Sequence, residues 1–471
     1  MSKLSAYEKK RLENIRANEA LLRGLDMPIL NVKSESRSKP LKKHTPKPTP
    51  KQPKVATRAS ARIRGKAPDL TDAAYDEPDQ KRAKYENVET KETMNEQDQK
   101  KFLGVLEDTL KMPNTTPSVK RERTPKEIKS YESLEKSLNK LEIRHEWSTV
   151  KVTTDRITHC LFHPSATKQL AIATDTGGWI GFWDVNGKEE DDEPVTYKYR
   201  PHKRSITDVH FNPADNTKLF SSSYDEFIRI FDMNTAQFDT LELGSGKYPI
   251  TGFDMTQDGH NVWFTTSDGE LGFVDTRASG KEAVIHEITA KKLGCVHLNP
   301  VHQHLMALSS NDRTGTIWDL RMWAKKSNKV EPLQSIEHGY SVTSSYWSPN
   351  GDMLVTTAYD SYIRLFDLNK DNKTLELKTA ISHNCKTGRW VTNLRARWNT
   401  NKIQGLNNQH LVIGNMNHQI NVISGETGKE MATLYDSDHI TAVPSVAQFH
   451  PSTATPVILT GNGSGRMVCW S

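Results

Sequence analysis

The sequence has few cysteines and no long apolar run, and each absence excludes a class of protein. Its 471 residues include four cysteines, Cys160, Cys295, Cys385 and Cys469. These are too few for a disulfide scaffold and lack the spacing of metal ligands. No apolar stretch approaches the roughly 18 residues that a membrane-spanning helix needs, and no signal peptide is seen. We therefore expect buried, reduced cysteines in a protein that neither spans a membrane nor is secreted.

Motifs of common catalytic sites are also missing. The sequence contains no Gly-x-Ser-x-Gly, no His-Glu-x-x-His and no phosphate loop ending in Gly-Lys-Ser/Thr. The 17 histidines do not pair at metal-ligand spacing on one predicted element. The glycine-rich run 461–465 lies between two predicted strands, which favours a hairpin turn over a phosphate site. We predict no catalytic residues, no metal, no cofactor and no small-molecule substrate.

What the sequence does contain is a repeat, seen best in residues 305–321. Residues 305–309 form a short apolar run typical of a buried strand, and residues 310–314 are polar turn residues. Residues 315–320 predict a second strand that ends in Trp318-Asp319. A Trp-Asp pair that closes a hairpin strand is the signature of a β-propeller blade.

Seven copies of this unit predict an all-β fold, a seven-bladed propeller over residues 144–471. The chain ends at Ser471, directly after the third strand of the last blade, so residues 147–153 should supply its outer strand and close the ring. The first strands of the blades should end at Phe162, Phe211, Phe253, Leu298, Trp347, Trp398 and Phe449.

The residues before the propeller are polar and unevenly charged. We predict an amphipathic helix within residues 1–28 and a disordered basic or polar linker over 29–143, with weak helical patches near 99–111 and 126–142. Residues 1–68 contain 18 Lys and Arg against 5 Asp and Glu. Within this arm Arg58, Arg62 and Arg64 could contact phosphates or lie in a DNA minor groove. The alternative is that the arm serves nuclear import alone.

Topology sorts the loops of a propeller onto two faces. The loops that enter each blade's first strand share one face with the turns between second and third strands. We expect the turn aspartates of that face to be hydrogen-bonded locally, Asp225 to His202 and Asp360 to His338. The entering loops gather cations that could hold a phosphate backbone. These candidate DNA-binding residues are Arg156, Lys203, Arg204, Lys291, Lys292, Lys386, Arg389 and Arg395.

One entering loop also carries an aromatic residue, Trp390, beside Gly388 and Arg389. If Trp390 projects, it could wedge into a base step while Arg389 contacts phosphate. The alternative is that Trp390 packs in the core of the first strand. Whether its side chain is exposed decides between the two.

The chain resembles the WD-repeat DNA damage-binding proteins, which include the small subunit of the UV-damaged-DNA-binding heterodimer and a fungal nuclear WD-repeat protein. In these proteins one propeller face binds duplex DNA and a loop at the position of Arg389-Trp390 inserts into the lesion. The resemblance implies that Arg156 and Lys292 meet phosphates. It departs in the loop, which lacks an aromatic-Gln-His triplet, and at Thr176, where relatives often carry Lys. The resemblance rests on residues 7–15, 155–156, 291–300, 316–321, 387–398 and 469–471.

We expect a non-enzymatic DNA-binding protein, located in the nucleus with the cytoplasm as a second compartment, whose partner is double-stranded and preferably damaged DNA. The alternative is a scaffold that binds chromatin, histones or peptides. Trp318, Asp319 and Arg321 resemble the signature by which ubiquitin-ligase substrate receptors dock on the adaptor of a cullin-type ligase. The same residues could equally be ordinary blade packing.

Overall fold

The computed structural model describes residues 94–110, 131–143, 148–165, 168–188, 193–278, 282–325, 330–371, 373–401 and 408–471. They belong to one compact unit, residues 77–471. The predicted helix within residues 1–28 and the arm with Arg58, Arg62 and Arg64 lie outside the described residues.

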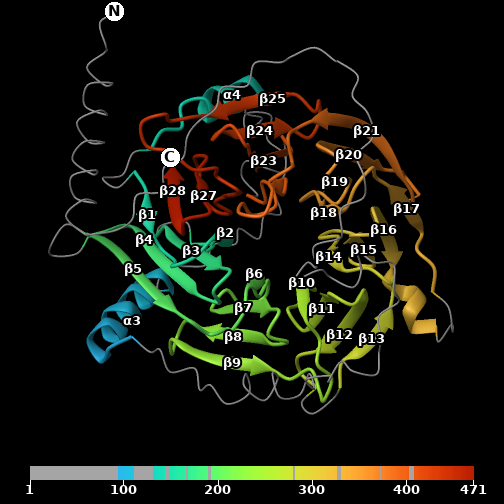
Figure 1. Ribbon diagram of the computed structural model, residues 1–471, viewed down its shortest axis with the longest axis horizontal. Coiled ribbons are helices and arrows are strands. Elements are labelled where there is room, and N and C mark those ends of the chain that lie inside the picture. The colour runs from blue at the N-terminus through green and yellow to red at the C-terminus, as the bar shows by residue number, and fades with distance from the viewer. Residues whose placement is uncertain are drawn as a thin grey trace, which may run out of the picture. The chain divides into compact units, whose positions relative to one another are not determined.

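Seven four-stranded antiparallel sheets are arranged in a ring about a central axis (Figure 1). Blade 1 holds β2 (Ile157–Phe162), β3 (Leu170–Asp175), β4 (Ile180–Lys188) and β5 (Pro194–Tyr199). Blade 2 holds β6 (Ile206–Phe211), β7 (Lys218–Ser223), β8 (Ile228–Asp232) and β9 (Gln237–Leu241). Blade 3 holds β10 (Ile250–Met255), β11 (Asn261–Thr266), β12 (Glu270–Asp275) and β13 (Val284–Glu287).

The remaining blades continue the ring in chain order. Blade 4 holds β14 (Leu293–Leu298), β15 (Leu305–Ser310), β16 (Thr314–Asp319) and β17 (Gln334–Glu337). Blade 5 holds β18 (Val342–Trp347), β19 (Met353–Ala358), β20 (Tyr362–Leu368) and β21 (Leu375–Ser382). Blade 6 holds β22 (Arg397–Trp398), β23 (His410–Gly414), β24 (Ile420–Ser424) and β25 (Glu430–Leu434). Blade 7 holds β26 (Val446–Phe449), β27 (Ile458–Gly461), β28 (Arg466–Trp470) and β1 (Val150–Lys151).

The seventh blade closes the ring as predicted. β1 pairs antiparallel with β28, with Val150 opposite Met467. Both side chains are buried, so the outer strand adds core as well as hydrogen bonds. The predicted all-β fold and its seven blades are confirmed.

The hairpin of β15 and β16 shows why the repeat folds this way. Leu305, Ala307 and Leu308 are fully buried, and Trp318 packs into the same blade. Between the strands Asp312 accepts hydrogen bonds from the Thr314 backbone N–H and from the Thr289 hydroxyl. The strand ends in the 3-10 helix η3 (Leu320–Lys325). The four cysteines are buried, as expected for small core residues.

Two helices pack on the outer edge of the propeller, which corrects one prediction. α3 (Glu96–Leu110) begins at Asn95, whose side chain accepts from the Asp98 N–H, and it buries Phe102 and Leu106 against blades 1 and 2. α4 (Tyr131–Leu138) buries Leu134 and Leu138 against blades 6 and 7. The prediction of a disordered linker over 29–143 is therefore wrong for residues 94–110 and 131–143, since their apolar stripes find partners on outer strands.

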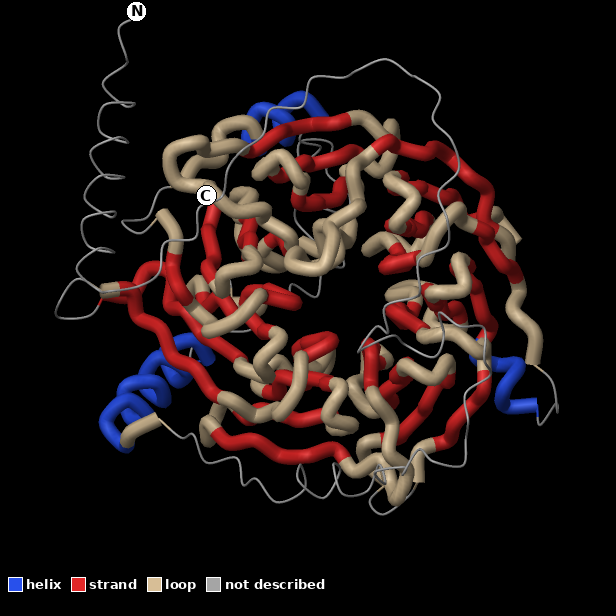
Figure 2. The backbone as a smooth tube through the Cα atoms, in the orientation of Figure 1, coloured by secondary structure: helices blue, strands red, loops and turns tan. Residues whose placement is uncertain are grey.

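Figure 2 shows these two helices outside the strands of the ring. None of the helices in the described part of the chain is long and apolar enough to cross a membrane. Within the same residues, no group of three His, Cys, Asp or Glu side chains is arranged to hold a metal ion.

Candidate nucleic-acid interface

We call the face that carries the loops entering each first strand the upper face, and the other the lower face. The turns between second and third strands also lie on the upper face, because neighbouring strands run antiparallel. All the described candidate DNA-binding residues except Arg395 lie in loops of the upper face. The loops that carry them enter blades 1, 2, 4 and 6.

Trp390 projects from the loop between β21 and β22. Its side chain is 76% exposed, the largest exposure among the large apolar side chains of the described residues. The Arg389 guanidinium carbon lies 5.1 Å from the centre of the indole ring, within cation–π distance. The interpretation of Trp390 as a core residue is therefore wrong.

The loop that carries Trp390, residues 383–394, is tied to blades 1 and 5 by three hydrogen bonds. The Arg156 Nη1 of blade 1 donates to the Arg389 carbonyl at 2.7 Å. The Tyr359 hydroxyl of blade 5 accepts from the Gly388 N–H at 2.8 Å, and Gly388 has φ +66°. The Thr392 hydroxyl donates to the Ile157 carbonyl. A loop held at both ends presents its exposed ring without further ordering when a ligand arrives.

Arg156 therefore has a contact that the sequence did not suggest. One of its Nη groups is used to hold the backbone of Arg389, and the side chain is only half-exposed. Its Nε group is buried and has no hydrogen-bond partner among the described residues. We interpret Arg156 first as a positioning residue for the loop and second as a phosphate contact.

A second cationic group surrounds Tyr224, in the turn between β7 and β8. Lys292 donates to the Tyr224 hydroxyl and its Nζ lies 4.9 Å from the ring centre. Arg204 donates from Nη1 to the Tyr224 carbonyl at 3.1 Å, with its guanidinium 5.9 Å from the same ring. Lys203 and the exposed Lys291 flank this pair in the chain. The cluster brings together cations of two entering loops that are 88 residues apart in sequence (204 to 292).

Other upper-face cations are also paired with aromatic rings. Lys386 lies 5.9 Å from the ring of Tyr340. Lys198 and Arg200 lie 5.4 Å and 5.8 Å from the ring of Trp179. Five of the nine large apolar side chains that are exposed in the described residues lie on this face: Phe227, Tyr340, Tyr362, Trp390 and Tyr435. Sequence reasoning found only Trp390. An aromatic residue two positions after a turn aspartate was the signal for two of the others, Phe227 after Asp225 and Tyr362 after Asp360.

The turn aspartates are held by local hydrogen bonds. Asp225 accepts from His202 Nδ1 at 3.0 Å and from the Lys203 N–H, as predicted. Burial would raise the pKa of Asp225, but His202 holds that pKa below its usual range, so the carboxylate stays charged. The predicted hydrogen bond between His338 and Asp360 is not formed. His338 bonds Thr356 and the Ile336 carbonyl instead, because Arg364 occupies Asp360 through two hydrogen bonds.

Arg395 does not join the upper-face residues. Its Nη1 lies 2.9 Å from His159 Nε2, and both residues line a cavity inside the ring, which we call the central channel. The backbone before β22 turns its side chain inward, because Leu394 and Ala396 on either side are buried in blade 6.

The predicted docking motif lies on the lower face, where β16 ends. Trp318 is buried and packs against Trp323 of η3. Arg321 forms a two-pronged ion pair with Asp319 and remains 63% exposed. Asp275 and Arg277 form the same pair in blade 3, and sequence reasoning missed this second copy although the spacing is identical.

Two segments, residues 194–232 and 330–367, match the WD domain, G-beta repeat. Each covers the outer strand of one blade and the first three strands of the next. The whole chain is 32% identical to the DNA damage-binding protein cmr1 of Aspergillus clavatus, across 100% of this chain and 99% of that protein. The chain belongs to the DNA damage-binding protein cmr1 family.

Other cmr1 proteins are similarly related. The protein of Neurospora crassa is 31% identical over 99% of this chain and 98% of its own length, and that of Emericella nidulans 30% over 99% of both. The alignments include the residues before the propeller as well as the seven blades. Membership in the cmr1 family confirms the resemblance drawn from the sequence.

Proposed function

We propose that this protein binds duplex DNA through its upper face, prefers damaged DNA and acts in the nucleus without catalysing a reaction. The relatives' printed name, DNA damage-binding protein, supports the choice of ligand. The observation that carries the proposal is the exposed Arg389-Trp390 pair on a loop fastened to blades 1 and 5.

The geometry suits a duplex that is kinked at one step. An aromatic ring inserted between bases replaces part of the stacking that is lost, and an adjacent guanidinium can hold the displaced phosphate. Unstacking costs a few kcal/mol and costs less at a damaged pair. Lesion preference should therefore come from Trp390, whereas Lys203, Arg204, Lys291, Lys292 and Lys386 supply affinity for any duplex.

The test is a titration of the full chain with an intact duplex and with the same duplex carrying a UV lesion, at several salt concentrations. We expect both to bind, the damaged duplex more tightly, with log affinity falling linearly against log salt. A chain with no affinity for either duplex at low salt contradicts the proposal.

The basic arm should add affinity for intact and damaged duplexes alike. Arg58, Arg62 and Arg64 are placed in a basic segment that can release counterions from any phosphate backbone. Deleting residues 33–66 should flatten the salt slope and weaken both duplexes by the same factor. An unchanged slope would assign the arm to nuclear import alone.

A second function, docking on the adaptor of a cullin-type ubiquitin ligase, is favoured by the exposed Arg321 on the lower face. Because Asp319 holds the Arg321 guanidinium in place, its remaining N–H groups can donate hydrogen bonds to an acceptor on a partner. A histone- or chromatin-binding scaffold would use the same fold. Arg321→Ala should abolish binding of the purified adaptor while DNA binding persists. Equal adaptor binding by the variant would remove this function.

A further inference from the structure

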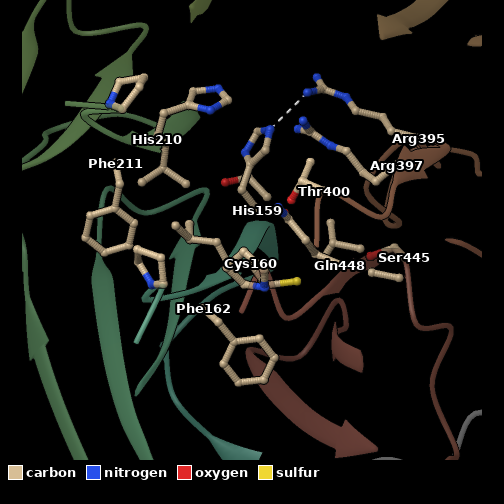
Figure 3. Close-up of a pocket in the computed structure, with 18 of the residues that line it drawn as sticks. His159, Cys160, Phe162, His210, Phe211, Arg395, Arg397, Thr400, Ser445 and Gln448 are labelled. Atoms are coloured by element: carbon tan, nitrogen blue, oxygen red, sulfur yellow. Dashed lines mark hydrogen bonds between the residues drawn. The ribbon is translucent and has the colours of Figure 1, made fainter. Parts of the chain in front are cut away.

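The central channel is a cavity of about 370 Å³ that the DNA-binding argument does not use. First strands of four blades, β2, β6, β22 and β26, supply its wall. Figure 3 shows Arg395 and Arg397 reaching into this space from blade 6, toward His159 of blade 1. Two half-buried cations in one cavity raise the question of what compensates their charge.

Asp208, a buried carboxylate near them, is already engaged. It is 2% exposed, accepts from the Val209 N–H, and lies 3.1 Å from His210 Nε2. Burial would raise the pKa of Asp208, but His210 and His159 hold it well below its usual range. Asp208 is thus shared between His210 and His159, whose Nε2 lies 3.6 Å away, and among the described residues it forms no ion pair with either arginine.

Several donors on this wall have no acceptor. Arg395 Nη1 donates to His159 Nε2, and that bond places the histidine proton on Nδ1. Among the described residues, His159 Nδ1, Arg395 Nε and the Ser445 hydroxyl have no hydrogen-bond partner. His159 and Ser445 are 7% and 2% exposed. These donors are closed off from the cavity, but Arg395 and Arg397 line it, and neither forms an ion pair with a carboxylate among the described residues. The two unpaired cations favour an anionic ligand there.

The rest of the cavity is lined by apolar and polar side chains, with Asn216 and Thr400 among the polar ones, and it extends to the lower-face turns. Phe162 and Phe211 form its sides, at the ends of two first strands. Pro164, Pro213 and Pro451 also line it, and each follows a first strand in a lower-face turn. Arg397 is fixed by stacking on Tyr346, with its guanidinium 4.0 Å from the ring centre. A ligand from the lower face would thus cross apolar surface before it meets the arginines.

We propose that the channel binds a carboxylate carried on an apolar body, as presented by an acidic peptide segment that enters from the lower face. Arg395 and Arg397 bind the carboxylate, and the phenylalanines and prolines contact the adjoining apolar residues. The site is separate from the upper face, so the protein can hold a peptide and DNA at the same time.

The first test uses 3-phenylpropionate as the probe for the full chain, with binding followed by ligand-observed NMR and calorimetry. Its neutral analogue 3-phenylpropanamide and inorganic phosphate are the comparison ligands. We expect the carboxylate to bind at least tenfold more tightly than either. Equal binding of the amide, or binding of phosphate alone, overturns the proposal.

Binding measurements on variants test whether the probe binds in the channel. Ser445→Leu fills the cavity next to the arginines and should remove detectable carboxylate binding, whereas Ser437→Leu, an exposed site in an upper-face loop, should not. Arg395→Lys keeps the charge but not the planar fork and should weaken binding several-fold. If Arg395→Lys does not fold, carboxylate binding by Ser445→Leu still tests whether the site lies in the channel. Undiminished binding by Ser445→Leu overturns the site.

Peptides then separate the two sources of a carboxylate. One short peptide carries Glu beside Leu and an amidated C-terminus, a second has Gln in place of Glu with a free C-terminus, and a third has Gln and an amide. Binding of the first or the second above the third identifies a side-chain or a terminal carboxylate. Equal binding of all three contradicts recognition of a carboxylate. Because DNA binding is measured separately, failure here leaves the proposed function standing.

Discussion

Trp390 on the upper face and Phe102 on the outer edge are aromatic residues with opposite surroundings. Both belong to segments outside the strand ladders of the blades. Phe102 is fully buried and lies 4.6 Å from the ring of Tyr197 and 4.9 Å from that of Phe182. Trp390 is 76% exposed and is contacted by the cation of its neighbour. The first ring is used to stabilise the fold, and the second is left for a ligand.

The way each segment is held explains the difference. Helix α3 is held by its buried apolar side chains, so the contacts that position the helix are the same contacts that bury Phe102. The Trp390 loop is held by its backbone, through Arg156 and Tyr359, so its side chain is not needed for stability. Four experiments separate these two uses, and they follow in order of expected effect.

The largest effect should come from removing everything that closes the ring. A chain that begins at Thr154 lacks β1, α3 and α4, which leaves one edge of β28 unpaired and uncovers Phe182, Tyr197 and Leu434. An exposed edge beside apolar surface promotes aggregation. We expect aggregation or a large drop in Tm, measured by light scattering and calorimetry. A chain that begins at residue 94 is the control, and equal Tm for both would show that β1 and the helices do not stabilise the propeller.

Phe102→Ala should be the most destabilising single substitution considered. Truncating a buried phenylalanine costs about 3–5 kcal/mol of the free energy of unfolding. Denaturant unfolding of the full chain measures this, with Lys101→Ala on the exposed side of the same helix as the control. DNA affinity at a temperature where the variant is folded should not change. A loss below about 1 kcal/mol would mean that α3 is only loosely attached.

These comparisons also show what the sequence could predict. The blades, their order and the closing strand follow from periodic strands and Trp-Asp ends, because each blade repeats the same local pattern. The packing of α3 could not be predicted, since its apolar stripe is weak and the aromatic surface that receives it comes from β4, β5 and β8.

For the candidate site, too, the sequence predicted one part and missed another. Topology predicted which cations share the upper face, because strand direction alone decides the face of a loop. It did not predict that Arg395 turns into the channel, because residues 391–396 before β22 are irregular and strand alternation does not apply there. Nor did it predict the contact between Lys292 and Tyr224, which joins loops of different blades.

Trp390→Ala should change DNA recognition and leave stability almost unchanged. Stacking of a base on an aromatic side chain is worth about 1–3 kcal/mol by alanine substitution, so the ratio of damaged to intact affinity should fall several-fold or more. Tm should stay constant because the ring is exposed. Trp390→Phe keeps a ring and should retain part of the preference. A Trp390→Ala variant with the original ratio would assign lesion preference to another part of the upper face.

Lys292→Ala should produce the smallest change and the opposite pattern. Its ammonium lies over Tyr224 between two entering loops, where it can meet one phosphate. Losing that contact should lower the slope of log affinity against log salt by about 0.9 and weaken intact and damaged duplexes by the same factor. Lys373→Ala, an exposed lysine in a lower-face loop, is the matched control and should leave the slope unchanged. If Lys292→Ala instead altered the ratio of damaged to intact affinity, phosphate contact and lesion recognition would not be separate on this face, because a purely electrostatic contact cannot distinguish two duplexes of equal charge.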